Sequence, residues 1–194
     1  MEIGATKAVQ DRLKTTKIEE SKGASLVFCW DTHLTKIKGR NVLFIVNASN
    51  RYTIAMTDIE PRNWNYYTMY IRSVIHGVMQ EMGYSEDQIG QYFKMSGDTT
   101  VTKTHGRKSV GGINRMVMDA QYFGKKLEKE AKYQWELSKY LNRDICQPEG
   151  FDAYGYPSEL FKLDMERLGI ATKRKPAKVI DFAQYIENNR GTNH

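Results

Sequence analysis

Three apolar runs that follow one another within residues 25–56 constrain the fold of this chain more than any other feature. The middle run, residues 42–46 (VLFIV), is the densest group of β-branched and aromatic residues in the sequence. Polar residues separate the runs at 38–41 and 47–50, and Gly39 suits a backbone turn with positive φ. Extended runs joined by such short turns predict an antiparallel β-meander.

A second pattern, between Trp64 and Met82, predicts one long helix. Its apolar residues recur at gaps of one, three or four positions, which places them in a single stripe. Asn63 is the expected N-cap, and Gly83 the expected C′ residue. We therefore predict an α+β fold in which a small antiparallel meander packs against a long helix, with additional helices in the C-terminal part.

Shorter patterns predict the remaining elements. Ser85 and Gln88 match a capping box, so a helix is expected from there to about residue 95. Thr6 is the expected cap of an early helix, and Pro157 the first residue of a late one. The other predicted elements are a strand at 2–4, helices at 6–13, 113–123, 127–141 and 158–168, a strand at 99–104, and a strand or amphipathic segment at 179–186.

Length and composition limit the classes to which the protein can belong. With 194 residues, the chain fits an α+β core at 1–125 and a helical extension at 126–194 that packs on it as one compact unit. No apolar run is long enough for a membrane span, and the first residues lack the apolar region of a signal peptide. Cys29 and Cys146 are too few for a disulfide framework, so we expect a cytoplasmic protein that does not contact membranes.

Positive charge is concentrated in one part of the chain. The net charge is +6, and residues 103–132 contain eight basic against three acidic residues. A solvated helix face is one interpretation, and a surface for nucleic acid or a ribonucleoprotein is the other. A second basic run lies at 173–178. The residues predicted to contact the anion are Arg107, Lys108, Ser109, Arg115, Lys125, Lys126, Lys129 and Lys132.

The glycine-rich stretch 106–112 (GRKSVGG) lies at the predicted junction of a strand and a helix. Such a junction presents unpaired backbone N–H groups that can hold a phosphate. Its spacing matches neither a Walker A motif nor GxGxxG. The alternative is that the glycines only allow close packing of the helix on the sheet.

Catalytic and metal-binding patterns are weak. Asp31 and His33 share one face of a predicted strand with Cys29, and His105 is a further candidate, so Asp31, His33 and His105 are the weak catalytic candidates. A polar outer face with one buried cysteine is the alternative. The histidines fit no zinc spacing, so neither a metal site nor a cofactor is predicted.

Three aromatic residues are candidates for binding a protein partner. Tyr66 and Tyr70 lie off the apolar stripe of the long helix, and Trp135 alternates with basic residues. A second packing partner for the helix is the alternative explanation for Tyr66 and Tyr70. Trp135 could instead stack on nucleic-acid bases or cover the sheet.

Two separate segments resemble a known family. Residues 30–34 (WDTHL) with 40–47 (RNVLFIVN) resemble the opening signature of a bacterial family described as domain of unknown function 6933. Residues 104–114 (THGRKSVGGIN) resemble its second segment, although Lys108 is inserted between Arg107 and Ser109. The resemblance covers about residues 2–125 and implies a single α+β domain of unassigned activity, so it assigns no catalytic residue.

These observations favour a non-enzymatic binding protein whose basic C-terminal half contacts nucleic acid or a ribonucleoprotein. An inhibitor of a host defence complex, encoded by a phage or a mobile element, is one setting that suits such a protein. A small hydrolase or nuclease is one alternative, and a module that binds only proteins is the other.

Overall fold

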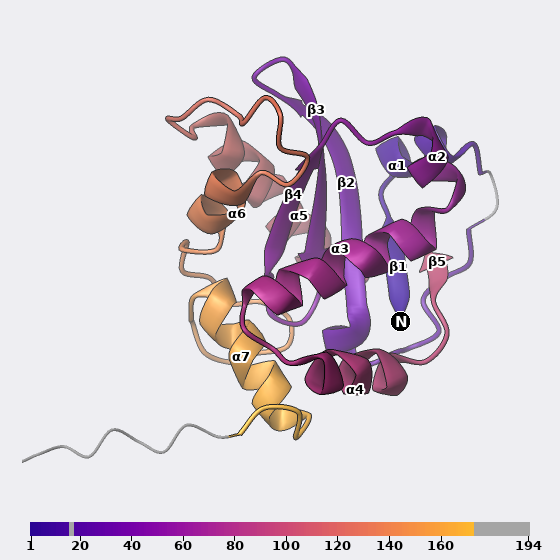
Figure 1. Ribbon diagram of the computed structural model, residues 1–194, viewed down its shortest axis with the longest axis vertical. Helices are drawn as coiled ribbons and strands as arrows, with labels where there is room; N and C mark the ends of the chain where they lie inside the picture. The colour runs from indigo at the N-terminus through magenta and orange to yellow at the C-terminus, as the bar shows by residue number, and fades with distance from the viewer. Residues whose placement is uncertain (16–17, 173–194) are drawn as a thin grey trace, which may run out of the picture.

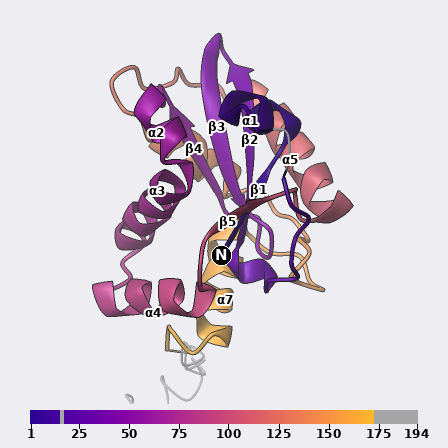
Figure 2. The same cartoon turned by 90° about the vertical axis from the view of Figure 1, so that its right-hand side faces the viewer.

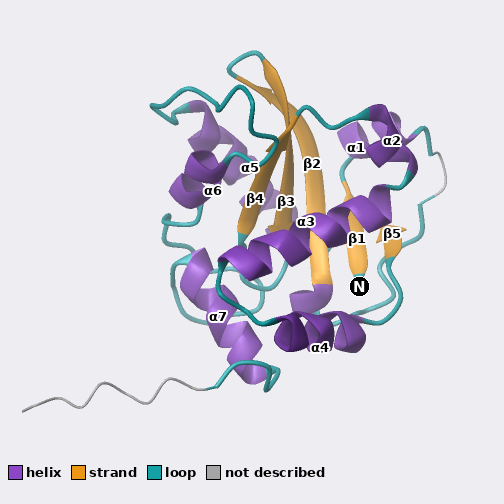
Figure 3. Ribbon diagram, viewed as in Figure 1, coloured by secondary structure: helices purple, strands orange, loops and turns teal. Residues whose placement is uncertain are grey.

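The fold is built on one mixed β-sheet, which a computed structural model shows together with its helices for residues 1–15 and 18–172 (Figures 1 and 3). The strands lie in the order β4-β3-β2-β1-β5. Strands β2, β3 and β4 are antiparallel, whereas β1 runs parallel to both β2 and β5. The α+β class and the three-stranded meander are confirmed, but the sheet as a whole is mixed. The five strands are β1 (Glu2–Ala5), β2 (Cys29–Ile37), β3 (Arg40–Asn47), β4 (Thr53–Thr57) and β5 (Thr100–Thr102).

Helices cover both faces of the sheet (Figure 2). On one face Ile71 and Ile75 of α3 share a hydrophobic core with Ile45 of β3, which confirms that the predicted apolar stripe lies on the sheet. On the other face Ile113 of α5 packs in a second core with Phe44. The described helices are α1 (Lys7–Leu13), the 3₁₀-helix η1 (Leu26–Phe28), α2 (Pro61–Asn65), α3 (Tyr67–Glu81), α4 (Glu86–Ser96), α5 (Gly106–Gln121), α6 (Trp135–Leu141) and α7 (Pro157–Arg167).

Several local signals are confirmed. Ser85 and Gln88 form the predicted capping box, in which the Gln88 N–H donates to Ser85 Oγ at 3.3 Å and the Ser85 N–H donates to Gln88 Oε1 at 3.0 Å. Gly39 and Gly83 have the positive φ expected of a turn and a helix end, at 81° and 88°. Pro157 is the first residue of α7.

The predicted long helix is wrong in one respect, because it is two helices. Tyr66, with φ −113° and ψ 41°, separates α2 from α3, and Glu60 takes the N-cap position expected of Asn63. Trp64 nevertheless stacks on Tyr67, with ring centroids 5.6 Å apart. The break keeps the apolar residues on the same side of the molecule, so the spacing of apolar residues did not reveal it.

The helix predicted at 127–141 is also wrong over its first half, since α6 begins only at Trp135. The preceding residues pair with the outer edge of β4 instead. The Thr57 N–H donates to the Lys132 carbonyl at 2.7 Å, and the Gln134 N–H donates to the Ala55 carbonyl at 2.9 Å. Backbone groups that bond to a sheet edge cannot also form helical hydrogen bonds.

Two further predictions about helix starts need correction. Helix α5 begins at Gly106, not near Ile113, so the glycine-rich stretch forms its first two turns. Thr6 precedes α1, but its hydroxyl donates to the Thr32 carbonyl at 3.0 Å and does not cap the helix. The basic run at 173–178 and the segment at 179–186 lie outside the described residues.

Candidate functional site

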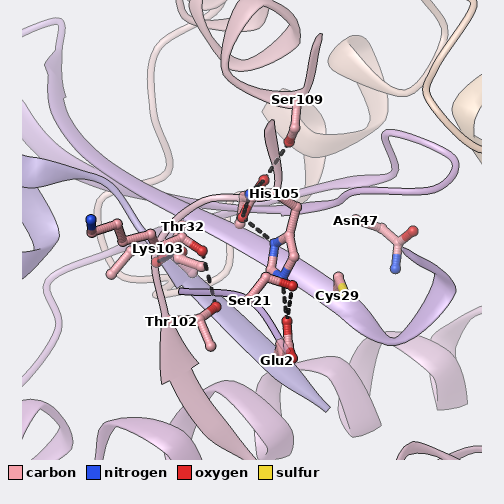
Figure 4. A network of polar contacts seen from close by, with 12 residues as sticks. Glu2, Ser21, Cys29, Thr32, Asn47, Thr102, Lys103, His105 and Ser109 are labelled. Carbon is pink, nitrogen blue, oxygen red and sulfur yellow. Dashed lines mark hydrogen bonds and ion pairs between the residues drawn. The ribbon is translucent and has the colours of Figure 1, made fainter. Parts of the chain in front are cut away.

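A continuous series of hydrogen bonds joins β1, β2 and the start of α5 (Figure 4). At its centre, His105 lies between two carboxylates, with Nδ1 at 2.7 Å from Asp31 Oδ1 and Nε2 at 3.0 Å from Glu2 Oε2. Hydroxyl groups complete the series at both ends, since Ser109 donates to Asp31 and Ser21 donates to Glu2, the latter at 2.6 Å. The side chains of His105, Glu2 and Asp31 are 2%, 5% and 0% exposed. The series is therefore a buried polar cluster, which we call the His105 cluster.

The parallel pairing of β1 and β2 brings the two carboxylates together. Glu2 is opposite Cys29 in the register, and Gly4 is opposite Asp31. A Cβ atom on Gly4 would lie 1.8 Å from Asp31 Oδ1, so only glycine leaves room for this carboxylate. Asp31 also accepts the backbone N–H of His105, at 3.2 and 3.3 Å from its two oxygens, which fixes the residue before α5.

The two carboxylates favour the protonated imidazole. Ionised carboxylates only accept hydrogen bonds, so both ring nitrogens of His105 must donate. Burial disfavours the charged ring, but the hydrogen bonds and charges of Asp31 and Cys29 outweigh it and raise the pKa of His105 to about 10. Burial alone would raise the pKa of Glu2. Hydrogen bonds from Ser21, the Lys22 N–H and His105 outweigh burial and keep the pKa of Glu2 below its usual value.

The geometry is not that of a Ser-His-Asp triad. Ser109 bonds to the carboxylate of Asp31 and not to the imidazole, whereas in the triad the nucleophilic hydroxyl bonds to the imidazole. His33 lies apart from the cluster, with Nδ1 3.2 Å from Thr6 Oγ1, and burial lowers its pKa. Five of the surface pockets among the described residues are lined by neither Asp31, His33 nor His105. The structure thus brings together two of the three weak catalytic candidates, in a buried position.

The alternative of a polar outer face on β2 with one buried cysteine is right for Cys29 and wrong for Asp31. Both residues are fully buried, because α5 packs over this face of the sheet. A strand pattern indicates which residues share a face, but it does not indicate which later segment covers that face.

A second feature is a basic pocket of about 360 Å³ beside the amino-terminal half of α5. Three cationic side chains, those of Arg51, Lys108 and Arg115, line it together with the carboxylate of Glu149. We call this feature the Arg51 pocket. Its remaining lining residues are Val46, Asn47, Ala48, Ser109, Gly111, Gly112, Gln147 and Pro148.

Arg51 was not predicted as a site residue, although it follows the turn signal at 47–50. It adopts a left-handed backbone conformation, with φ 65°, between β3 and β4. Its guanidinium donates to the Gly112 carbonyl at 3.1 Å, and a Cβ on Gly112 would approach Arg51 Nε to 3.3 Å. The glycine therefore lets the guanidinium lie against α5.

The predicted anion-binding residues fall into two groups at the ends of α5. Lys108, Ser109 and Arg115 line the Arg51 pocket, and Arg107 is exposed on the same part of the helix. The second group follows the helix, which at 16 residues is about 24 Å long. That group consists of Lys125, Lys126, Lys129 and Lys132, all exposed.

Several of these cations have carboxylate partners. Lys125 lies 2.5 Å from Glu136, and Lys132 bonds to Glu60. Arg115, which lines the pocket, has its Nε 3.1 Å from Oδ1 of Asp119, a residue outside the pocket lining. Lys108 is held only loosely, at 3.9 Å from Glu149. Exposed ion pairs of this kind are weak, so they leave the cations able to exchange partners.

The predicted partner-binding aromatics do not form one surface. Tyr66 is 66% exposed between α2 and α3, whereas Tyr70 is partly buried against the core. Trp135 is 41% exposed and lines a different pocket together with Glu81, at the opposite end of α3.

The comparisons with known proteins concern the family and not the chemistry. No curated protein and no solved structure matches the chain. None of the helices in the described part of the chain has the length and apolarity that crossing a membrane requires. The model of the family described as domain of unknown function (DUF6933) matches residues 2–160, which extends the expected resemblance through α6 to the start of α7. The His105 cluster and the Arg51 pocket lie within the matched part, and the chain belongs to the DUF6933 family.

Proposed function

We propose that this protein is a non-enzymatic binding protein that holds phosphate groups of a nucleic acid in the Arg51 pocket. The observation that carries the proposal is the convergence of Arg51, Lys108 and Arg115 on one concave surface, where Glu149 is the sole carboxylate among the lining residues. The pocket therefore has an excess of positive charge at neutral pH, and a concave site focuses that charge on a bound anion.

The backbone of α5 adds to this attraction. Its first N–H groups have no partner within the helix, and its dipole places partial positive charge at this end. Lys108 belongs to the first helical turn and lines the pocket, so its side chain can contact a phosphate there, whereas the Ser109 hydroxyl donates to Asp31. Phosphate contacts of this kind supply affinity without sequence specificity.

The test is binding of fluorescently labelled single-stranded and duplex DNA and RNA, followed by anisotropy at several salt concentrations. We expect a Lys108→Glu, Arg115→Glu double variant to bind at least about tenfold more weakly than the unmodified chain. The logarithm of the binding constant falls linearly with the logarithm of the salt concentration, and loss of two phosphate contacts should make this slope less negative by about two. Lys94→Glu, an exposed charge reversal on α4, is the matched control and should bind almost normally.

A second pair of variants, Lys125→Glu and Lys126→Glu, measures whether the basic residues after α5 extend the surface. Salt-independent binding, or an equal loss in the Lys94→Glu control, would contradict the proposal. Binding of a ribonucleoprotein without affinity for free nucleic acid would instead support the narrower hypothesis of an inhibitor of a host defence complex.

A further inference from the structure

Three side chains with different donor atoms meet inside the His105 cluster. A carboxylate oxygen of Glu2, the sulfur of Cys29 and a ring nitrogen of His105 all lie within 4.8 Å of one another. We propose that these three residues bind a zinc ion, a site that is independent of the Arg51 pocket. Glu2 lies on β1, Cys29 begins β2, and His105 precedes α5, so the ion would connect three segments that are far apart in the sequence.

The donor set suits zinc. Thiolate, imidazole and carboxylate are its usual protein ligands, at about 2.3, 2.0 and 2.1 Å from the ion. Two ligands of one zinc ion are then about 3.2–3.9 Å apart, so closing from 4.8 Å requires side-chain shifts of about an ångström or less. Harder cations such as Mg²⁺ prefer sites made only of oxygen ligands.

The partners of these ligands have the arrangement found around zinc. Asp31 accepts a hydrogen bond from His105 Nδ1 at 2.7 Å, which leaves Nε2 directed toward Glu2. Zinc would replace the proton that Nε2 donates to Glu2, because a nitrogen that ligates a metal must be deprotonated. A carboxylate that orients the opposite nitrogen of a ligating histidine is a recurrent outer-shell contact of zinc sites. Asp31 is itself held by Ser109 and by the His105 N–H, so the ring cannot rotate freely.

Three protein ligands leave the fourth position of a tetrahedral site to a water molecule, close to the Ser21 hydroxyl, which donates to Glu2 Oε2 at 2.6 Å. Cys29 is fully buried, and the side chains of His105 and Glu2 are nearly so, which shields a bound ion from solvent. We therefore assign the ion a structural role, in which it ties β1 and β2 to the start of α5.

Cobalt substitution tests the site directly. The full chain is stripped with a chelator, freed of the chelator and titrated with Co²⁺, whose bond to a thiolate gives a charge-transfer absorption in the near ultraviolet. The Cys146→Ser variant contains Cys29 as its single cysteine, so any thiolate absorption in that variant must come from Cys29. We expect the absorption in the unmodified chain and in Cys146→Ser, saturation at one Co²⁺ per chain, and its loss on addition of Zn²⁺.

The ligand variants complete the test. Glu2→Gln should bind Co²⁺ at least about tenfold more weakly, and Cys29→Ser should lose the charge-transfer absorption altogether. Should Cys29→Ser fail to fold, the result in Cys146→Ser still decides, because that variant retains every proposed ligand. Absence of the absorption in the unmodified chain, or its loss in Cys146→Ser with folding intact, would overturn the proposal.

Discussion

Gly4 on β1 shows how a single residue permits the buried cluster to form. It lies opposite Asp31 in the sheet, and the Asp31 carboxylate occupies the space that a side chain on Gly4 would need. The carboxylate in turn bonds to the ring of His105. The requirement for glycine here comes from close packing, because Gly4 is not among the residues with positive φ.

We expect Gly4→Ala to lower the free energy of unfolding by about 1–3 kcal/mol, because the new methyl group would overlap Asp31 Oδ1. Urea unfolding followed by circular dichroism measures the effect. Gly77→Ala in α3 is the matched control, since a Cβ there meets no atom within 4 Å, and it should gain about 0.5–1 kcal/mol. Equal stability of Gly4→Ala and the unmodified chain would mean that Asp31 is not held in this position.

At the scale of elements, one buried carboxylate fastens α7 to the turn between β3 and β4. Asp164 Oδ2 accepts a hydrogen bond from Asn50 Nδ2 at 2.9 Å, and Arg167 lies 3.3 Å from its other oxygen. The residue is only 4% exposed. Burial raises its pKa, although Asn50, Ser49 and Arg167 act in the opposite direction.

The sign of this shift gives a pH prediction. The pKa of Asp164 is higher in the folded than in the unfolded protein, so its contribution to stability is complete at low pH and is lost as pH rises through the folded value. Relative to Asp164→Asn, the unmodified chain should therefore become less stable as the pH rises above the ordinary aspartate pKa of 3.8. Urea midpoints of both proteins below and above this pKa measure the difference.

Glu159→Gln, at the start of the same helix, is the control for a general effect of removing a carboxylate from α7. A stability difference between Asp164→Asn and the unmodified chain that stays constant with pH would contradict the assigned shift.

For the whole molecule, the C-terminal part completes the sheet at its β4 edge. Asn142 accepts the Thr53 N–H at 2.8 Å and donates to the Thr53 carbonyl at 2.7 Å, while Ser138 Oγ accepts the Ala55 N–H at 3.0 Å. Figure 1 shows α6 beside this strand. Phe161 of α7 packs in the hydrophobic core that also contains Ile45 and Ile71. Without these residues the edge strand would expose unpaired backbone groups.

We expect Asn142→Ala to cost about 2–5 kcal/mol, since it leaves two buried backbone groups of Thr53 without partners. Unfolding followed in parallel by tryptophan fluorescence and circular dichroism should give coincident transitions, as one cooperative unit requires. Asn114→Ala, at an exposed position of α5, should change stability by less than about 0.5 kcal/mol. Two separated transitions in the unmodified chain would show that 126–194 unfolds independently of the core.

Several predictions that depended only on neighbours in the sequence were accurate, although the caps expected of Thr6 and Asn63 were not. The capping box at Ser85 and Gln88 needs only residues three positions apart, and the meander needs only short turns between apolar runs. Predictions failed where the backbone forms hydrogen bonds with a distant segment instead of within a helix. Residues 127–134 are the example, because hydrogen bonds join this segment to β4 before α6 begins. The break at Tyr66 was missed because it leaves the apolar spacing unchanged.

The sequence by itself determined most of the strands and helices, and it marked Asp31, His105 and the basic start of α5 as chemically distinctive. Only the tertiary structure decided that Glu2, Cys29 and His105 would meet, and that Arg51 would join Lys108 and Arg115. The physical reason is the range of the interactions. Periodicity and capping act within a few residues, whereas these sites depend on strand register and on a helix returning to the sheet after some 70 residues.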